Sequence, residues 1–337
     1  MVGNNSFEKF GIHNNAERYS WVAYNSFVCL SSLFGDSLIL YASFQKDTFK
    51  MNKFIVAIIQ HIAVCDLAYA ISSVLPLTLS LIANSWVLGE AMCYARVYLG
   101  HFIYPAGLFE IAFLTTSKML LLRFPIRCST WTAKRARVIS CITTTSALTF
   151  PLLLFVMDRN DIWFDYRFYT CDYQYSNKNW EWLKIALTFI NHFTPNTVIV
   201  ATTIPTLRYL AAARKSAKRV RGSVPWQGAI TVALTAIVSC ISNIVNFTVE
   251  TVIEPNIFIS LSKEEPLIVQ CTRVGKYLLF INIMSNFYIY CLTIKSFRRF
   301  LRERISSYLT RFSRRSGNNA NIEGNLQQEK SENVEKN

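Results

Sequence analysis

Three acidic residues lie inside long apolar stretches of the sequence: Asp36, Asp66 and Glu110. A charge in such surroundings is costly, and acids kept there usually serve a function. A carboxylate of this kind can hold a cation, share a proton or accept hydrogen bonds from a polar partner. The sequence therefore predicts a polar core inside an otherwise apolar protein.

Other kinds of chemistry lack their usual signatures. The sequence has no Walker box, no H-E-x-x-H and no C-x-x-C pair. Its four histidines are too scattered to suggest a metal site. We therefore expect neither an enzyme nor a metal centre.

The composition indicates a membrane protein. Hydrophobic residues make up 52% of the 337 residues and charged residues only 17%, whereas soluble domains carry about a quarter charged residues. Seven stretches are apolar and long enough to cross a bilayer as helices, at 21–44, 54–83, 97–122, 138–157, 183–207, 228–249 and 267–294. Weak amphipathic patterning within these runs argues against seven core helices of a soluble protein. The sequence thus predicts an all-α membrane protein, a seven-transmembrane helix bundle.

Basic residues gather in alternate connections of this bundle, at 45–53, 118–137, 208–221 and 295–315. The positive-inside rule then places the N-terminus outside and the C-terminus in the cytosol. Because the basic residues interrupt apolar runs, the net charge of +14 predicts attraction to anionic membrane lipids and to a cytosolic partner rather than to nucleic acid. The sequon at Asn4 predicts glycosylation on the outer side.

Four regions follow from this topology. Residues 1–20 form an extracellular N-terminus and residues 21–294 form the seven-transmembrane bundle. Apolar residues at helical spacing between arginines predict an amphipathic membrane-surface helix at 295–312. Residues 313–337 are polar and predict a disordered cytoplasmic tail.

Short motifs in three of the predicted spans resemble one receptor family. Trp86, Gly89 and Cys93 form W-x-x-G-x-x-x-C before the third span, and 62–66 (Ile-Ala-Val-Cys-Asp) resembles the L-A-x-x-D box. Residues 286–290 (Asn-Phe-Tyr-Ile-Tyr) resemble N-P-x-x-Y. In this order the motifs are similar to those of rhodopsin-like G-protein-coupled receptors over about residues 20–310. The resemblance implies a plasma-membrane receptor that binds an extracellular ligand in its helix bundle and activates a heterotrimeric G protein, with arrestin and receptor kinase as further partners.

The sequence also departs from that family. Ser117-Lys118-Met119 stands in place of Asp-Arg-Tyr, and 240–243 (Cys-Ile-Ser-Asn) in place of Cys-Trp-x-Pro. Phe287 replaces the proline of the seventh helix, and Asp36 replaces the usual asparagine of the first. The chain is therefore expected to be a divergent member, with weak, constitutive or absent signalling all left open.

The resemblance assigns roles to several polar residues. It implies a disulfide between Cys93 and Cys171, and a polar core or sodium site formed by Asp36, Asp66, Asn282 and Asn286. Two carboxylates there would need a sodium ion or a shared proton, while a static hydrogen-bonded core is the alternative, and Gly107 lacks the hydroxyl that many sodium sites use. Glu110 is expected to form a structural polar pair with His61.

The ligand and the G protein are expected at opposite ends of the bundle. Gly100 disfavours an amine ligand, and a basic, aromatic cavity favours an anionic small molecule, a lipid or an acidic peptide. The residues expected to line it are His101, Tyr104, Lys184, Thr188, Asn191, Thr248, Arg273, Lys276 and Phe280. Those expected to couple to the G protein are Ser117, Lys118, Pro125 and Tyr290. In the alternative interpretation of the cavity, its basic residues reach lipid headgroups or pair with nearby acids. The alternative functions are a non-signalling seven-helix scavenger or scaffold, and a channel or transporter.

Overall fold

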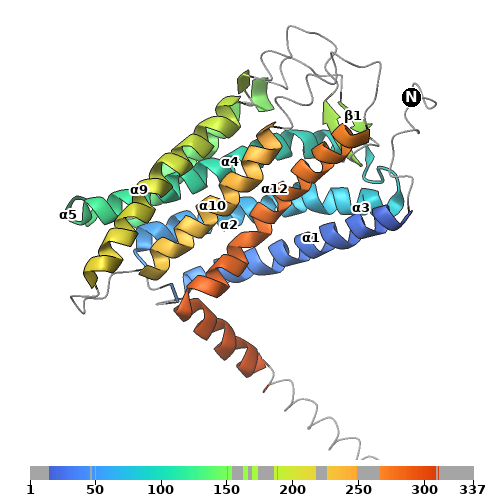
Figure 1. Cartoon of the computed structure of the whole chain (residues 1–337). Helices are drawn as coiled ribbons and strands as arrows, with labels where there is room; N and C mark the ends of the chain where they lie inside the picture. The colour runs from blue at the N-terminus through green and yellow to red at the C-terminus, as the bar shows by residue number, and fades with distance from the viewer. Residues whose placement is uncertain are drawn as a thin grey trace, which may run out of the picture.

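The computed structural model describes residues 15–45, 48–49, 51–149, 151–153, 162–165, 169–173, 186–187, 189–217, 226–248, 266–308 and 310. The long helices in this part of the chain run side by side as one bundle (Figure 1). A small β-hairpin lies at one end of the bundle, and the short helix α5 (Pro125–Cys128) lies at the other (Figure 1). The two ends are therefore built differently.

Seven rods form the described bundle. In chain order they are α1 (Asn15–Phe44); α2 (Lys53–Tyr69), which continues through η2 (Ala70–Val74) into α3 (Leu75–Ala83); α4 (Gly89–Arg123); α6 (Ala133–Ala147); η3 (Phe189–Phe193), which continues into α9 (Thr194–Ala217); α10 (Trp226–Thr248); and α12 (Pro266–Thr293). A further helix, Lys295–Tyr308, follows α12 at an angle of 95°. Each rod covers most of one predicted span, except α6, which covers half of 138–157; α4 begins eight residues before the predicted 97 and α9 runs ten residues beyond the predicted 207.

Two of the rods contain a five-residue π-helical turn just before a proline. The turn η2 comes before Pro76, and η3 comes before Pro195. Proline has no amide hydrogen to donate and its ring clashes with the carbonyl one turn earlier. In a membrane helix such a break is tolerated where local π geometry satisfies the freed backbone groups again.

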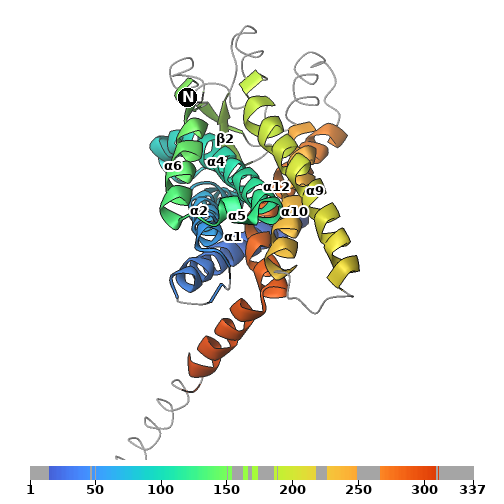
Figure 2. The ribbon, with the colours of Figure 1, turned by 90° about the vertical axis from the view of Figure 1, so that its left-hand side faces the viewer.

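Helix α4 occupies the centre of the bundle. It packs against α2, α6, α9 and α10, while α1 and α12 pair with each other at one side (Figure 2). Buried apolar side chains form one cluster around Ile58, Leu114 and Phe297 and another around Tyr69, Leu108 and Tyr277. Polar residues on different faces of α4 can therefore contact different neighbouring helices.

The described helices differ in how apolar they are. Asn15–Phe44, Lys53–Ala83, Gly89–Arg123 and Ala133–Leu153 are each long and apolar enough to cross a membrane, and a fifth span is counted if Val274–Thr293 and Lys295–Tyr308 form one bent unit. Helix α9 falls outside this set; five threonines, two prolines, Asn196 and Arg208 stand among its apolar residues. Its threonine hydroxyls bond to carbonyls one turn earlier, as in Thr197 to Phe193 (2.9 Å) and Thr206 to Thr202 (2.8 Å).

Candidate functional site

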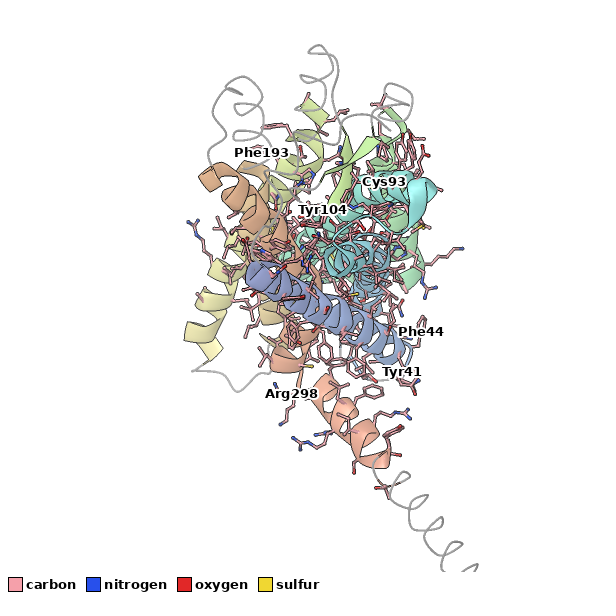
Figure 3. All side chains as sticks on the ribbon, turned by 90° about the vertical axis from the view of Figure 1, so that its right-hand side faces the viewer. Tyr41, Phe44, Cys93, Tyr104, Phe193 and Arg298 are labelled. Carbon is pink, nitrogen blue, oxygen red and sulfur yellow. A yellow bond between two sulfur atoms is a disulfide. The ribbon has the colours of Figure 1, made fainter. Side chains whose placement is uncertain are left out.

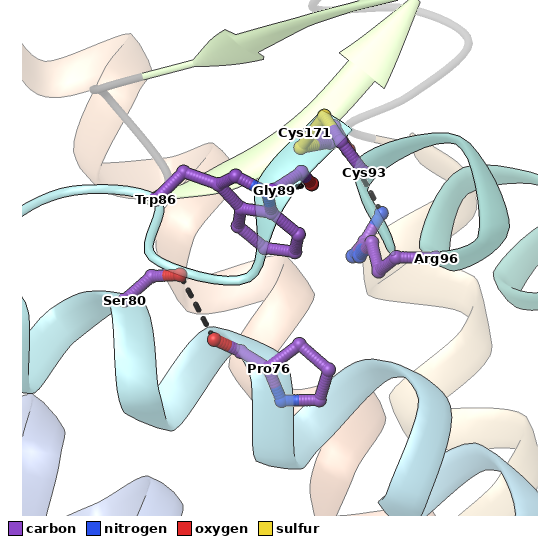
Figure 4. Close-up of a disulfide and its surroundings, with 7 residues drawn as sticks. All are labelled: Pro76, Ser80, Trp86, Gly89, Cys93, Arg96 and Cys171. Atoms are coloured by element: carbon purple, nitrogen blue, oxygen red, sulfur yellow. Dashed lines mark hydrogen bonds between the residues drawn. A yellow bond between two sulfur atoms is a disulfide. The ribbon is translucent and has the colours of Figure 1, made fainter. Parts of the chain in front are cut away.

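A disulfide joins the β-hairpin to the start of α4. Strands β1 (Ile162–Asp165) and β2 (Thr170–Tyr173) pair antiparallel, and Cys171 of β2 bonds to Cys93 of α4, with their Cα atoms 5.4 Å apart (Figure 4). Arg96 supports the bond by donating to the carbonyl of Cys171 at 3.0 Å. The predicted disulfide is thus present, and it fixes the hairpin across one end of the bundle.

The W-x-x-G-x-x-x-C motif has a local structural reason. The indole Nε1 of Trp86 donates to the carbonyl of Gly89 at 2.7 Å (Figure 4). Gly89 has φ of +78°, a conformation that glycine adopts without a steric penalty. The tryptophan and the glycine therefore shape the turn that leads into α4 and positions Cys93.

The predicted ligand residues lie only partly in the described region. Tyr104, Asn191 and Phe280 are buried, and His101 and Lys276 are half-buried. Lys184 and Thr188 lie outside the described residues, as do the side chains of Thr248 and Arg273. The amide of Asn191 donates to the carbonyl of Leu187 in its own helical segment (3.0 Å). The predicted cluster as a whole therefore stays a prediction.

A continuous series of aromatic rings crosses this end of the bundle. Trp21 of α1 stacks on Tyr277 of α12 with centroids 3.7 Å apart. The series goes on through ring contacts of Tyr277 with Phe280, Phe280 with Tyr69, Tyr69 with Tyr104, and Tyr104 with His192. Figure 3 places Tyr104 within the bundle, nearer to Cys93 than to Arg298. Sequence analysis singled out Tyr104 and Phe280 but missed Trp21, Tyr69, Tyr277 and His192, because their contacts join residues far apart in the chain.

The acidic core brings together the four residues expected there. Asp36 and Asp66 are both buried and lie within range of electrostatic interaction. Ser32 donates to Asp36 at 2.5 Å, and the amide of Asn286 donates to Asp66 at 2.7 Å. No basic side chain among the described residues pairs with either carboxylate. Like charges in such a place need a counter-ion or a proton.

A small cavity lies beside Asp66. It measures about 10 Å³, close to the room that one water molecule needs. Asp66, Tyr104, Gly107 and Asn282 are among its lining residues. The Oδ1 atom of Asn282 is buried and has no hydrogen-bond partner among the residues that the structure describes. Carboxylate and amide oxygens are the ligands that a hard cation prefers, so the lining fits one small cation bound directly by these oxygens, or one ordered water.

Glu110 binds hydroxyl groups of the neighbouring helix. The fully buried carboxylate on α4 accepts hydrogen bonds from Ser140 and Thr143 of α6, both at 2.7 Å, and a longer one from Thr144. His61 lies within electrostatic range. Sequence analysis named His61 and missed the hydroxyls, although their spacing at positions i, i+3 and i+4 places them on one face of a helix.

The residues expected to couple to a G protein lie toward the α5 end. Ser117 and Lys118 near the end of α4 are buried, and Pro125 begins α5. Among the described residues, no carboxylate pairs with Lys118. Tyr290 is buried, and its hydroxyl has no hydrogen-bond partner within the described part of the chain. A hydrogen bond from Thr202 of α9 to Thr115 of α4 (2.9 Å) joins two helices in the same region.

The fold is that of the rhodopsin-like seven-helix proteins. The chain is similar to the crystal structure of squid rhodopsin, with a TM-score of 0.69 over 92% of this chain and 91% of that one. The sequence identity of 14% means that the likeness is one of fold. No protein-family model and no curated protein sequence matches the chain. The comparison confirms the predicted fold class, an all-α, seven-transmembrane bundle.

Proposed function

We propose that the chain is a divergent rhodopsin-like G-protein-coupled receptor of the plasma membrane. The fold likeness to squid rhodopsin over 92% of the chain is the observation that carries this proposal. The disulfide-linked hairpin at one end of the bundle supports it, because it fixes β1 and β2 at the end where an extracellular ligand would enter. Binding between the helices would then bias two arrangements of the bundle.

The charge pattern supports the orientation in this proposal. The basic segment 118–137 and the described part of the basic segment 295–315, residues 295–308 and 310, lie toward the end of the bundle that carries α5 and the helix Lys295–Tyr308. That end therefore faces the cytosol, the G protein and the anionic lipids of the inner leaflet. The N-terminus, with its sequon at Asn4, lies outside, and the tail after 312 would meet receptor kinase and arrestin.

The ligand is an anionic small molecule, a lipid or an acidic peptide rather than an amine. Glycine at position 100 offers no counter-ion for an amine, and the described aromatic series offers flat apolar contacts. Lys276, half-buried on α12, supplies a cation near this series. Arg273 and Lys184 are expected to add positive charge.

Coupling would run through the buried cytosolic end of α4. Ser117 removes the acidic partner that the resemblance would supply, and Lys118 keeps a charge there without the planar fork of arginine. Pro125 and Tyr290 are the other proposed coupling residues. The acidic pair Asp36–Asp66, with Asn282 and Asn286, would hold a sodium ion or one proton and favour the inactive arrangement.

The unpaired Lys118 also favours a second candidate function. A bundle without the usual charge lock could bind ligand as a scavenger or scaffold and never activate a G protein. A channel or transporter is the third candidate, although the sequence has no internal repeat of the kind that builds many transporters.

A reporter screen separates these functions. Cells carrying the full chain and a promiscuous G-protein reporter are challenged with fatty acids, small organic anions, acidic peptides and amines. We expect a response to one of the first three classes, which falls with Lys276→Ala and is altered by Lys118→Ala. Ligand binding without any G-protein response would contradict the receptor proposal and support the scavenger, and ligand-dependent ion currents would support the channel.

A further inference from the structure

Helix α10 carries a fully buried asparagine in its apolar interior. Asn243 is bonded at both ends of its amide group: its Nδ2 donates to the carbonyl of Ser239 at 2.6 Å, and its Oδ1 accepts a hydrogen bond from the hydroxyl of Tyr104 on α4. The bond to Ser239 stays within α10. The bond from Tyr104 crosses between two helices and therefore ties α10 to the centre of the bundle.

Interhelical hydrogen bonds help to fix the position of a membrane helix. Apolar side chains pack about as well against lipid tails as against another helix, so burial alone holds a helix weakly in place. Toward the opposite end of α10, Thr231 bonds to Thr293 of α12 at 2.7 Å. Twelve residues, roughly 18 Å of helix, separate Thr231 from Asn243. The two contacts thus hold α10 to different neighbours at different depths.

Tyr104 lies between the aromatic series and the acidic core around Asp66. Its ring belongs to the aromatic series that leads from Trp21 to His192, and it also lines the cavity beside Asp66. A change in either place would move the hydroxyl that binds Asn243. The Tyr104–Asn243 bond is therefore well placed to respond to ligand or ion.

We infer that the hydrogen bond from Tyr104 to Asn243 is a conformational lock that holds α10 against α4, and that α10 moves when it is broken. The inference rests on the proposed function only in what the movement achieves. The lock itself is a property of the bundle and can be measured without a ligand or a G protein.

Hydrogen exchange of the purified full chain in lipid nanodiscs measures the lock directly. Tyr104→Phe removes the hydroxyl and keeps the ring. We expect amide exchange in α10 around Asn243 to rise roughly 3- to 20-fold, which corresponds to the strength of interhelical hydrogen bonds in membranes. Asn243→Leu removes the same bond together with the one to Ser239, so its effect should be at least as large, and the double variant should not exceed Asn243→Leu.

Tyr24→Phe is the matched control. It also removes one interhelical hydrogen bond, from Tyr24 of α1 to the carbonyl of Tyr277 of α12 (2.8 Å), but leaves α10 untouched. Its α10 exchange should equal that of the wild type. Unchanged α10 exchange in Tyr104→Phe, an equal rise in Tyr24→Phe, or additive effects in the double variant would overturn the lock. If Asn243→Leu does not fold, the two tyrosine variants decide alone.

A reporter measurement then separates the lock from the receptor proposal. If both hold, Tyr104→Phe raises ligand-free G-protein signalling and Tyr24→Phe does not. Faster α10 exchange with no signalling leaves the lock standing and counts against the proposed receptor function.

Discussion

The backbone of Gly35 on α1 lies directly against Phe287 on α12. A Cβ atom placed on Gly35 would lie 2.6 Å from the Cβ of Phe287 and 2.7 Å from its Cγ. Phe287 stands where the resembled motif has proline, so α12 has a bulky side chain at the point where it approaches α1. The absence of a side chain at position 35 is what lets the two helices meet there.

Replacing Gly35 by alanine should therefore destabilise the bundle. The added methyl group meets atoms close to the α12 backbone, which cannot turn away, and overpacking of this kind costs about 1–3 kcal/mol. Thermal unfolding of the purified protein in detergent measures the loss. Gly107→Ala is the control, because its Cβ would lie 3.8 Å from the Cβ of Cys65, an ordinary contact. Equal unfolding temperatures for Gly35→Ala and the wild type would contradict the close approach.

Loss of the disulfide should reduce the amount of folded protein. Cys93 and Cys171 are 78 residues apart in the sequence, and closing a loop of that length stabilises by about 4 kcal/mol in the chain-entropy model. Cys171→Ser is expected to lower surface staining several-fold, as is Cys93→Ser. Cys141→Ser, which removes an exposed free thiol, should leave staining unchanged. Normal staining of both disulfide variants would show that the hairpin does not need the bond.

Glu110 should be needed for folding because it joins α4 to α6. Glu110→Ala leaves the buried hydroxyl of Ser140 without its acceptor, a loss of about 1–3 kcal/mol for a buried group left unpaired, whereas the half-buried hydroxyl of Thr143 can still donate to the carbonyl of Ser140. We expect lower surface expression and a lower unfolding temperature. Glu90→Ala removes an exposed acid from the same helix and serves as the control. If both variants reach the surface equally well, the contact with α6 is dispensable.

Sodium should stabilise the folded protein through Asp66. A cation that binds only the folded state raises its stability by mass action. Exchanging choline for sodium at constant ionic strength is expected to raise the unfolding temperature of the wild type by a few degrees, and Asp66→Asn should abolish the rise. Glu90→Gln should keep it.

A different response would identify a shared proton instead. A proton held by the Asp36–Asp66 pair only in the folded state stabilises at low pH, and the stability is lost as pH rises. The unfolding temperature would then fall with rising pH in the wild type and ignore sodium. An unfolding temperature that depends on neither sodium nor pH would instead indicate a static hydrogen-bonded core.

The helices were predictable because hydropathy is a local property. A run of apolar residues such as 54–83 predicts a membrane-spanning helix whichever helices pack against it. The sequence therefore located the rod of α2, η2 and α3. Hydropathy placed the start of α4 too late, at 97, although the turn that leads into it at Gly89 is shaped locally by the hydrogen bond from Trp86 to Gly89. Features that depend on near neighbours in the chain could be derived from sequence.

Contacts between helices could not be derived in the same way. Tyr104 and Asn243 are 139 residues apart, and Glu110 lies 30 residues before Ser140. Which side chains meet depends on how each helix is rotated, and weakly amphipathic helices give little sign of their rotation. The sequence therefore indicated that Glu110 needs a polar partner, but it did not identify the hydroxyl groups of Ser140 and Thr143 that donate to it.

The threonines of α9 bear on how membrane topology is deduced from composition. Hydropathy scales treat every hydroxyl as if it lacked a hydrogen-bond partner in the bilayer. The hydroxyls of Thr197 and Thr206, however, already donate to backbone carbonyls of the preceding turn. A lipid tail meets mainly their methyl groups. A helix of this type can therefore cross a bilayer although its composition alone would not assign it as a span.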